Sequence, residues 1–416
     1  MKEQKMTARG LRCKECRTEY PLEALFVCDQ CFGPLEVHYD FSGLDTDEVK
    51  RKIQSGPRSI WRYADFLPTN GSPHDTLHPG TTPLLRADRL AERLGVGEIW
   101  VKNDAANPTH SFKDRVVAVA LAKAIELGFD TVACASTGNL ANSVAANAAA
   151  AGLDSYVFVP ADLEEQKLLA TDVYGTELIG VRGSYDDVNR LCTEIAQERG
   201  WAFVNVNIRP YYAEGSKTLA YETVEQLGWK LPDKVVCPIA SGSLFTKIGR
   251  GFDEWRELGL VEGEKPAFYG AQASGCGPVA TAFADGEDFC RPVKPDTIAK
   301  SLAIGTPADG PYALDLARGT GGSVTGVSDD EIRAGIRLLA ETTGVFTETA
   351  GGVTTATLAR LAEEGELGPD DRVVVYITGE GLKTLDAVRE GFAMHEIDPS
   401  LEQFNAEVSP REAVSA

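Results

Sequence analysis

The sequence predicts an α/β protein with mostly parallel sheets covered by helices, preceded by a small N-terminal module built around cysteines. Two observations predict this fold class. Short runs that are almost continuously apolar alternate with helical patterns, which is typical of parallel sheets buried on both faces; the runs lie at residues 131–135, 155–159, 177–181, 235–239 and 372–377. In addition, four of the nine cysteines are grouped near the N-terminus.

The composition sets limits on the class of protein. A chain of 416 residues is long enough for two domains or for one large two-lobed enzyme. Its net charge of −21 argues against general nucleic-acid binding, because the phosphate backbone would be repelled. No stretch approaches the roughly 18 apolar residues of a membrane span. Residues 1–10 lack the apolar core of a secretion signal. We therefore expect a cytoplasmic protein with no membrane partner.

The N-terminal cysteines have the spacing of a metal site. Cys13, Cys16, Cys28 and Cys31 form C-x2-C-x11-C-x2-C. Two such pairs place four thiolates at the corners of a tetrahedron, which suits structural zinc and closes its coordination shell. The alternative is a ribbon held by packing alone, without metal. We predict a zinc-ribbon-like module over residues 1–42, and expect the scattered cysteines to be reduced thiols.

The segment N-P-T-H-S-F-K-D-R, residues 107–115, precedes a helical pattern at 116–127. Lys113 therefore lies near a helix start, where the positive end of the helix dipole disfavours the ammonium and favours the free amine. A free amine is what a Schiff base requires. The alternative is a surface lysine at a helix terminus. We take Lys113 as the candidate catalytic residue.

Three other segments have ligand-binding character. Residues 136–143 form a turn rich in hydroxyls, Gly and Asn between a strand and a helix, and A-S-G-S-L at 240–244 occupies a similar position. Backbone N–H groups at such helix starts bind anions; the alternative for the first turn is ordinary capping by Ser136 or Thr137. Thr378 follows the strand at 372–377, where a hydroxyl can meet a ligand. An amine, two anion sites and a neutral hydroxyl match pyridoxal phosphate and an amino-acid substrate better than a nucleotide.

Residues 203–218 interrupt the alternation of strands and helices. The segment reads F-V-N-V-N-I-R-P-Y-Y-A-E-G-S-K-T, and its side chains are polar and aromatic. We interpret it as a loop that either holds the substrate or crosses between lobes. Its candidate substrate-binding residues are Asn207, Arg209 and Lys217.

Taken together, N-P-T-H-S-F-K-D-R, A-S-T-G-N and V-V-V-Y-I-T-G-E-G-L-K resemble the threonine synthases, in the tryptophan-synthase-β-like group of pyridoxal-phosphate enzymes. The resemblance covers about residues 78–390 in the family's order. It implies a two-lobed catalytic domain over residues 43–400, with a smaller lobe at about 128–225 inserted in the larger one. It also suggests a homodimer. Residues 401–416 are expected to form a loose tail.

The resemblance also implies roles for single residues. Lys113 would hold the cofactor and move protons, Phe112 would lie against the pyridine ring, and Asn139 would bond the phenolic oxygen. Ser136 and Thr137 would hold the substrate α-carboxylate, and Thr378 would bond the pyridine nitrogen. The cofactor phosphate would lie on Ala240, Ser241, Gly242, Ser243 and Leu244. The implied reaction converts O-phospho-L-homoserine and water to L-threonine and phosphate.

The chain departs from the family's pattern at several positions. His110 stands where Gly is frequent and could touch the substrate, Tyr212 stands in the position of a phosphate-binding Arg, and Arg209 could substitute for that Arg. The phosphate loop lacks the usual Asn residues, and Glu380 replaces a His. The alternatives are a cysteate-synthase-like β-replacement on O-phosphoserine, or a threonine/serine dehydratase. A non-catalytic zinc-ribbon binding protein is a further reading, from a different class.

Overall fold

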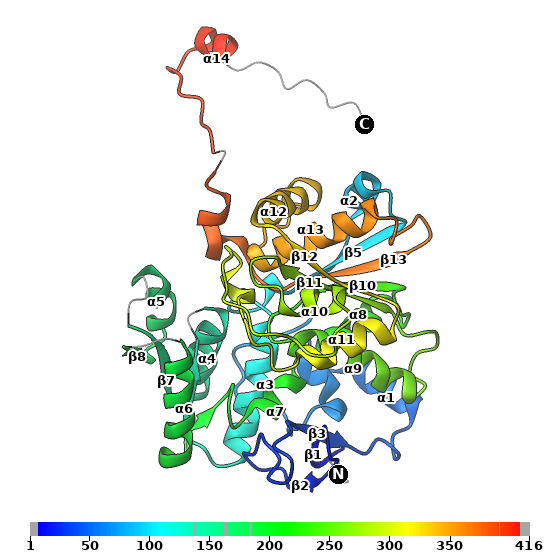
Figure 1. The fold of residues 1–416 in the computed structure, drawn as a ribbon, viewed down its shortest axis with the longest axis vertical. Coiled ribbons are helices and arrows are strands. Elements are labelled where there is room, and N and C mark those ends of the chain that lie inside the picture. The colour runs from blue at the N-terminus through cyan, green and yellow to red at the C-terminus, as the bar shows by residue number, and fades with distance from the viewer. Residues whose placement is uncertain (1–6, 137, 162–164, 183–184, 391, 408–416) are drawn as a thin grey trace.

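The computed structural model describes residues 7–136, 138–161, 165–182, 185–390 and 392–407. Within these residues the strands form three sheets, and the sheets correspond to three parts of the molecule (Figure 1). A six-stranded sheet forms the larger lobe, a four-stranded sheet forms the smaller lobe, and a three-stranded sheet forms the N-terminal ribbon. This arrangement confirms the predicted α/β class.

The larger sheet is parallel except for one edge strand. Its order is β12 (Val324–Val327), β11 (Ala267–Ala273), β10 (Lys234–Pro238), β13 (Arg372–Ile377), β5 (Glu98–Asn103) and β4 (Leu84–Arg86). Only β4 pairs antiparallel, with β5. The central strands are buried along nearly their whole length, as their continuous apolar runs predict.

Helices cover both faces of this sheet (Figure 1). One face carries α2 (Asp88–Leu94), α12 (Asp329–Thr343) and α13 (Thr349–Glu363); the other carries α8 (Lys217–Gln226), α9 (Ser243–Glu257), α10 (Pro278–Ala284) and α11 (Gly310–Gly319). Aromatic side chains fill the second face, and Tyr63, Phe66, Tyr221 and Trp255 are all buried there in one cluster. The remaining elements outside the smaller lobe and the ribbon are α1 (Thr46–Ser55), η1 (Ile60–Phe66), η2 (Asp104–Ala106), α3 (Lys113–Glu126), α7 (Arg209–Glu214), η3 (Lys300–Leu302), η4 (Gly381–Val388) and α14 (Leu401–Glu407).

The smaller lobe has a wholly parallel sheet in the order β8 (Glu177–Val181), β7 (Asp154–Pro160), β6 (Thr131–Ala135) and β9 (Ala202–Phe203). Its helices are α4 (Asn139–Ala151), α5 (Glu165–Asp172) and α6 (Tyr185–Arg199). The strands predicted at 131–135 and 177–181 have these same bounds. The lobe's boundaries within the chain stay a prediction, although α8 already packs into the core of the larger lobe.

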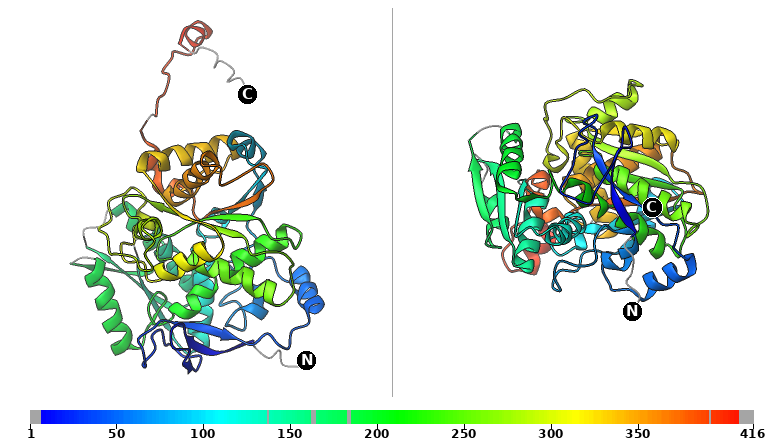
Figure 2. Two further views of the ribbon diagram at one scale, coloured as in Figure 1. Left: turned by 45° about the vertical axis from the view of Figure 1, so that its right-hand side comes forward. Right: turned by 90° about the horizontal axis from the view of Figure 1, so that it is seen from below.

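The ribbon contains β1 (Ala8–Cys13), β2 (Glu19–Tyr20) and β3 (Leu35–Tyr39), which pair antiparallel. It lies at the bottom of the molecule, below α7, in Figure 1 and in the left view of Figure 2. Leu11 and Val37 of the ribbon share one buried cluster with Val116 of α3 and Tyr211 of α7. The ribbon is therefore packed against the body rather than tethered to it.

The prediction of a loop over residues 203–218 is wrong for most of the segment. Pro210 stands in the first turn of α7, where a missing N–H costs nothing, and α8 begins at Lys217. Two of its charged side chains, Glu214 and Lys217, are buried in ion pairs: Lys217 pairs with Glu214 and with Glu254.

The C-terminal segment extends away from the body (Figure 2). Its helix α14 has no buried residue. Among the described residues, no helix is both long and apolar enough to cross a membrane.

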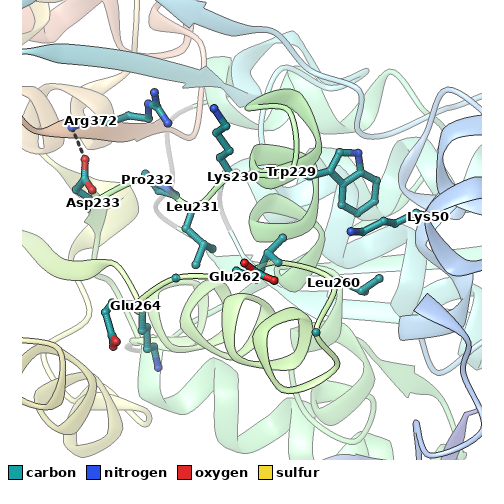
Figure 3. A pocket seen from close by; sticks show the side chains of 14 residues that line it. Lys50, Trp229, Lys230, Leu231, Pro232, Asp233, Leu260, Glu262, Glu264 and Arg372 are labelled. Carbon is teal, nitrogen blue, oxygen red and sulfur yellow. Dashed lines mark hydrogen bonds between the residues drawn. The ribbon is translucent and has the colours of Figure 1, made fainter. Parts of the chain in front are cut away.

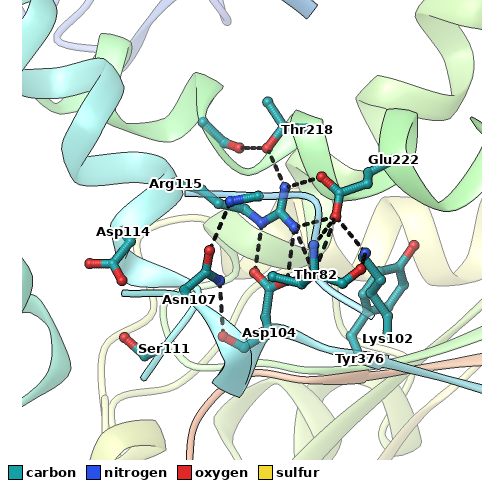
Figure 4. Close-up of polar contacts among 12 residues, drawn as sticks. Thr82, Lys102, Asp104, Asn107, Ser111, Asp114, Arg115, Thr218, Glu222 and Tyr376 are labelled. Carbon is teal, nitrogen blue, oxygen red and sulfur yellow. Dashed lines mark hydrogen bonds and ion pairs between the residues drawn. The ribbon is translucent and has the colours of Figure 1, made fainter. Parts of the chain in front are cut away.

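A cluster of buried charges joins β5, α3 and α8 (Figure 4). The guanidinium of Arg115 pairs with Asp104, with Nε to Oδ2 at 2.7 Å, and with Glu222, with Nη2 to Oε1 at 2.9 Å. Lys102 donates to the same Glu222 oxygen at 2.5 Å. Thr82 donates its backbone N–H to Glu222 and its hydroxyl to Asp104. Burial opposes ionisation of Glu222, but Arg115 and Lys102 outweigh it and hold the pKa of Glu222 well below its ordinary value.

Replacing Glu222 by Gln is expected to destabilise the fold strongly. The change leaves the two buried cations with Asp104 as the remaining carboxylate of the cluster, and breaking a buried pair costs about 3–5 kcal/mol of unfolding free energy. Urea unfolding followed by circular dichroism measures the loss. The matched control is Glu257→Gln on α9, whose carboxylate is 63% exposed, and which should change the midpoint little. Equal midpoints for the two variants would contradict a structural role for the cluster.

Candidate active site

Lys113 is the first residue of α3, after Phe112 at the N-cap. Its Nζ donates a hydrogen bond of 2.9 Å to the hydroxyl of Tyr212 on α7. The same amine lies 4.5 Å from the centroid of the Phe112 ring. The sequence correctly places Lys113 at a helix start, and the structure adds Tyr212 as its direct partner.

Three of the helix N-termini without a side-chain cap lie at predicted site residues. They belong to α3, α4 and α9, and the last two begin after Gly138 and Gly242. By contrast, α12 has a complete capping box between Ser328 and Glu331. An uncapped N-terminus leaves backbone N–H donors available to a bound anion. These starts include the two turns predicted as anion sites.

The turn before α9 requires glycine. Gly242 has φ +95°, and a Cβ there would lie 2.7 Å from the carbonyl oxygen of Asp309. Asp309 closes the other side of the turn, because its backbone N–H donates to the Ser241 carbonyl at 2.8 Å. A close backbone approach with small side chains is the geometry that cradles a phosphate.

Thr378 follows β13 and is buried. Its carbonyl accepts the backbone N–H of Phe112 at 2.9 Å, and Gly379 forms a β-bridge with Ser111. The hydroxyl predicted to meet the pyridine nitrogen thus stands beside the turn that carries Lys113. Because β10 and β13 are neighbours in the sheet, the phosphate-loop candidate begins at the same edge.

Asn139, the first residue of α4, lies between two charged side chains. Its Nδ2 donates to the carboxylate of Glu348 at 2.9 and 3.1 Å, and its Oδ1 accepts from Lys383 Nζ at 2.7 Å. If the amide were flipped, its NH2 group would face the ammonium of Lys383 and its oxygen would face the carboxylate of Glu348, and both contacts would be repulsive. The pair therefore fixes the amide orientation.

Glu348 is buried at the N-cap of α13, and a Cβ at Gly379 would overlap its carboxylate. Burial raises the pKa of Glu348, while the hydrogen bond from Asn139 and the charge of Lys383 limit the rise. Burial lowers the pKa of Lys383, and the nearby carboxylate of Glu348 offsets part of this decrease. Each group thus favours the charged form of the other in a poorly solvated place.

Glu348 was not among the predicted site residues, and no role was predicted for Lys383. The available signals were weak. Glu348 opens a helix in T-E-T-A-G-G, and Lys383 ends the quoted motif T-G-E-G-L-K. Asp114 was also missed; it is buried and accepts hydrogen bonds from the hydroxyls of Thr109 at 2.7 Å and Ser143 at 2.6 Å. These contacts tie the Lys113 turn to α4.

The four cysteines of the ribbon meet as predicted. Their Sγ atoms all lie within 4.8 Å of one another, with Cys13 and Cys31 at 3.4 Å and Cys16 and Cys28 at 3.5 Å. Thiolates at Zn–S distances of about 2.3 Å occupy tetrahedral corners with similar separations. The cluster could hold a zinc ion.

Comparison with known proteins agrees with this geometry. Residues 76–379 match the model of the family described as pyridoxal-phosphate dependent enzyme. The chain is 37% identical over 379 residues to the threonine synthase of Methanocaldococcus jannaschii, covering 90% of this chain and 93% of that protein. It is also 37% identical over 376 residues to the threonine synthase of Methanosarcina acetivorans, covering 90% and 92%. This chain is a member of the threonine synthase family of pyridoxal-phosphate-dependent enzymes.

Solved structures share the fold at lower sequence identity. A fungal L-serine ammonia-lyase from Rhizomucor miehei superposes with a TM-score of 0.65 at 22% identity, covering 77% of this chain and all of that one. The resemblance confirms the two-lobed fold predicted for this member of the threonine synthase family. In this chain, the amine of Lys113 fits the reactive carbon of the cofactor, and the neutral hydroxyl of Thr378 fits its ring nitrogen. The uncapped start of α9, which contains Gly242, fits its phosphate.

The predicted substrate-binding residues of this family member divide into two groups. Ser136 and His110 lie at the site: Ser136 follows β6, and exposed His110 has φ 61°, which explains why glycine is favoured at its position. Thr137 lies outside the described residues. Arg209 reaches the phosphate-loop side, where it pairs with Asp309 at 2.7 Å.

The polar atoms of the Asn207 and Lys217 side chains bind other groups of the protein. Asn207 accepts the backbone N–H of Phe203 at 2.8 Å and donates to the carbonyl of Trp201. Lys217 is fully buried and pairs with Glu214 at 2.7 Å and Glu254 at 3.0 Å. We leave both out of the proposed substrate site.

A cavity of about 570 Å³ lies elsewhere, around Trp229 and residues 259–265 (Figure 3). Its lining includes the cations Lys50, Lys230 and Lys265, and also Glu262. None of the predicted site residues lines it. The cavity is therefore separate from the site at Lys113.

Glu348→Ala is expected to weaken cofactor binding about tenfold, because loss of a charge-assisted hydrogen bond frees the Asn139 amide to turn. Glu348→Gln keeps an acceptor for Nδ2 and should retain most of the affinity. Titration of cofactor-free protein with pyridoxal phosphate, followed by visible absorbance, measures both. Indistinguishable affinities for wild type and the Ala variant would disprove this role for Glu348.

Proposed function

We propose that this protein converts O-phospho-L-homoserine and water to L-threonine and phosphate, with pyridoxal phosphate bound at Lys113. The observation that carries the proposal is the position of Lys113 at the start of α3, next to Thr378 and the uncapped start of α4. Two threonine synthases that match nearly the whole chain support the reaction. The enzyme would be a lyase of threonine biosynthesis.

The cofactor supplies an electron sink for charge that develops at the substrate's carbon atoms. Lys113 holds it, and then moves protons at Cα and Cβ of the substrate. Tyr212 orients the Lys113 amine through its hydroxyl, 2.9 Å away. Thr378 would offer the ring nitrogen a neutral hydroxyl, which would leave that nitrogen largely unprotonated and moderate the electron sink.

The remaining groups bind and orient. Phe112 would lie against the cofactor ring, and Asn139, held by Glu348 and Lys383, would bond its phenolic oxygen. The backbone of residues 240–244 holds the cofactor phosphate. Ser136 and Thr137 hold the substrate α-carboxylate. We assign His110 and Arg209 to the outer part of the substrate, where its phosphate leaves from Cγ and water adds at Cβ.

A second candidate reaction is β-replacement on O-phosphoserine. The observation that favours it is Tyr212, a neutral residue in the position of a phosphate-binding Arg, with its hydroxyl on Lys113. A threonine or serine dehydratase would use the same cofactor residues. These reactions differ from the first in the substrate groups that His110, Arg209 and Tyr212 must recognise.

The proposal includes the setting of the enzyme. We place it in the cytoplasm, where its substrate is a small phosphorylated amino acid and its partner is a second copy of the chain. Neither a nucleic acid nor a membrane is part of the proposed function. The net charge of −21 is in keeping with the first exclusion.

Lys113→Ala is expected to lower kcat/KM about a thousandfold or more, because both covalent attachment and proton transfer are lost. The variant should also lose the visible absorbance of covalently held cofactor. Lys52→Ala on α1, with a side chain 44% exposed, is the control and should behave as wild type. Normal turnover by Lys113→Ala would refute the assignment.

Product analysis distinguishes the candidate reactions. Incubation with O-phospho-L-homoserine, followed by NMR, should yield threonine and phosphate in equal amounts. 2-Oxobutyrate with phosphate would show elimination without directed addition of water. No turnover in protein that visibly holds the cofactor would favour O-phosphoserine and would make Tyr212 the reason.

A further inference from the structure

The first pair of metal-site cysteines encloses two residues that reach the catalytic part. Lys14 and Glu15 lie between Cys13 and Cys16. Lys14 Nζ is 3.1 Å from the centroid of the Tyr312 ring on α11 and 3.8 Å from Asp309 Oδ1. Glu15 accepts a hydrogen bond from the Tyr312 hydroxyl. Two adjacent side chains of the metal-binding turn, Lys14 and Glu15, thus contact the start of α11.

Asp309 carries this contact to the phosphate loop. Its side chain is only 12% exposed and binds Lys14 from the ribbon and Arg209 from α7. Its backbone N–H donates to the carbonyl of Ser241, and its carbonyl is the atom that excludes any side chain at Gly242. A displacement of Asp309 therefore displaces the turn before α9.

A second connection runs through α7. Buried Tyr211 donates its hydroxyl to the carbonyl of Glu23 in the ribbon, at 2.7 Å. The next residue, Tyr212, accepts from Lys113. Tyr39 of β3 donates to Glu214 at the end of the same helix, at 2.7 Å. The ribbon thus contacts the helix that contacts Lys113, and it reaches the loop assigned to the phosphate through Asp309.

Metal binding bears directly on the geometry of this turn. Lys14 and Glu15 are bracketed by two of the four ligands, so closing the coordination shell fixes the backbone from which both side chains project. Without the metal, a ribbon of this size has little core of its own to hold the turn. Lys14 and Glu15 should therefore be well ordered when the metal is bound and less ordered when it is absent.

We propose that the metal-loaded ribbon is a structural part of the cofactor site, and that its metal strengthens binding of the cofactor phosphate through Lys14, Asp309 and the turn at Gly242. This inference rests on the proposed function, which assigns residues 240–244 to that phosphate. Lys14 is a positioning residue: it holds Asp309 and does not contact the cofactor.

The test measures the dissociation constant of pyridoxal phosphate for the full-length protein, zinc-loaded and zinc-stripped, by absorbance titration. We expect stripping to weaken binding about tenfold. Zinc-loaded Lys14→Met should show most of this loss, and stripping it should add little, because the two changes act on one contact. Arg9→Met, an exposed ribbon cation paired with Asp40, is the matched control and should bind as wild type does.

Pyridoxal, which lacks the phosphate, makes the test specific. Its affinity should differ little between wild type and Lys14→Met. An equal loss for both ligands would overturn the phosphate route. Unchanged pyridoxal phosphate affinity in folded, zinc-loaded Lys14→Met, checked by circular dichroism and metal content, would overturn the inference.

Lys113→Ala separates this failure from failure of the proposed function. Loss of covalently held cofactor in that variant, together with wild-type behaviour of Lys14→Met, would remove the ribbon's role alone. Covalently held cofactor in Lys113→Ala would instead remove the proposed site, and the inference with it.

Discussion

The buried pairing of Arg115 with Asp104 and Glu222 is the constraint on which the position of Lys113 depends. Two cations, Arg115 and Lys102, and two carboxylates, Asp104 and Glu222, are buried together, and their formal charges cancel. Each would be costly alone, so the elements that carry them must stay in register. Those elements are α3, β5 with the turn after it, and α8. Because Arg115 is two residues after Lys113, the same register fixes the lysine.

Around this anchor, parallel topology supplies the rest of the site. The carboxyl ends of parallel strands meet at one edge of a sheet, and the helices that follow begin there with unsatisfied N–H groups. In this chain the starts of α3, α4 and α9 are left without side-chain caps, while the helix α12 is fully capped. A bound anion can accept hydrogen bonds from the backbone N–H groups that no side chain caps.

The sequence predicts those parts that rest on local patterns. Apolar runs locate β6, β8 and β13 to the residue, and a strand followed by small or hydroxyl residues locates the anion turns. Patterns of that kind cannot show that Lys217 finds two carboxylates in the core, so α7 and the first two residues of α8 were predicted to be a loop. Nor can they show that Glu348 faces Asn139, which is 209 residues away in the chain. Those contacts exist only once the lobes are packed.

The charges beside the turn proposed to hold the cofactor phosphate show why the position of that turn matters more than the net charge around it. Lys14, Arg209 and Lys247 gather there, yet Asp309, Glu36 and Glu214 face them. These six side chains therefore carry no net formal charge. In a protein of net charge −21, a phosphate dianion must then be held chiefly by backbone N–H groups and the dipole of α9, both of which act at short range. Such a site loses affinity when its turn moves, which makes the groups that hold the turn as important as those that touch the phosphate.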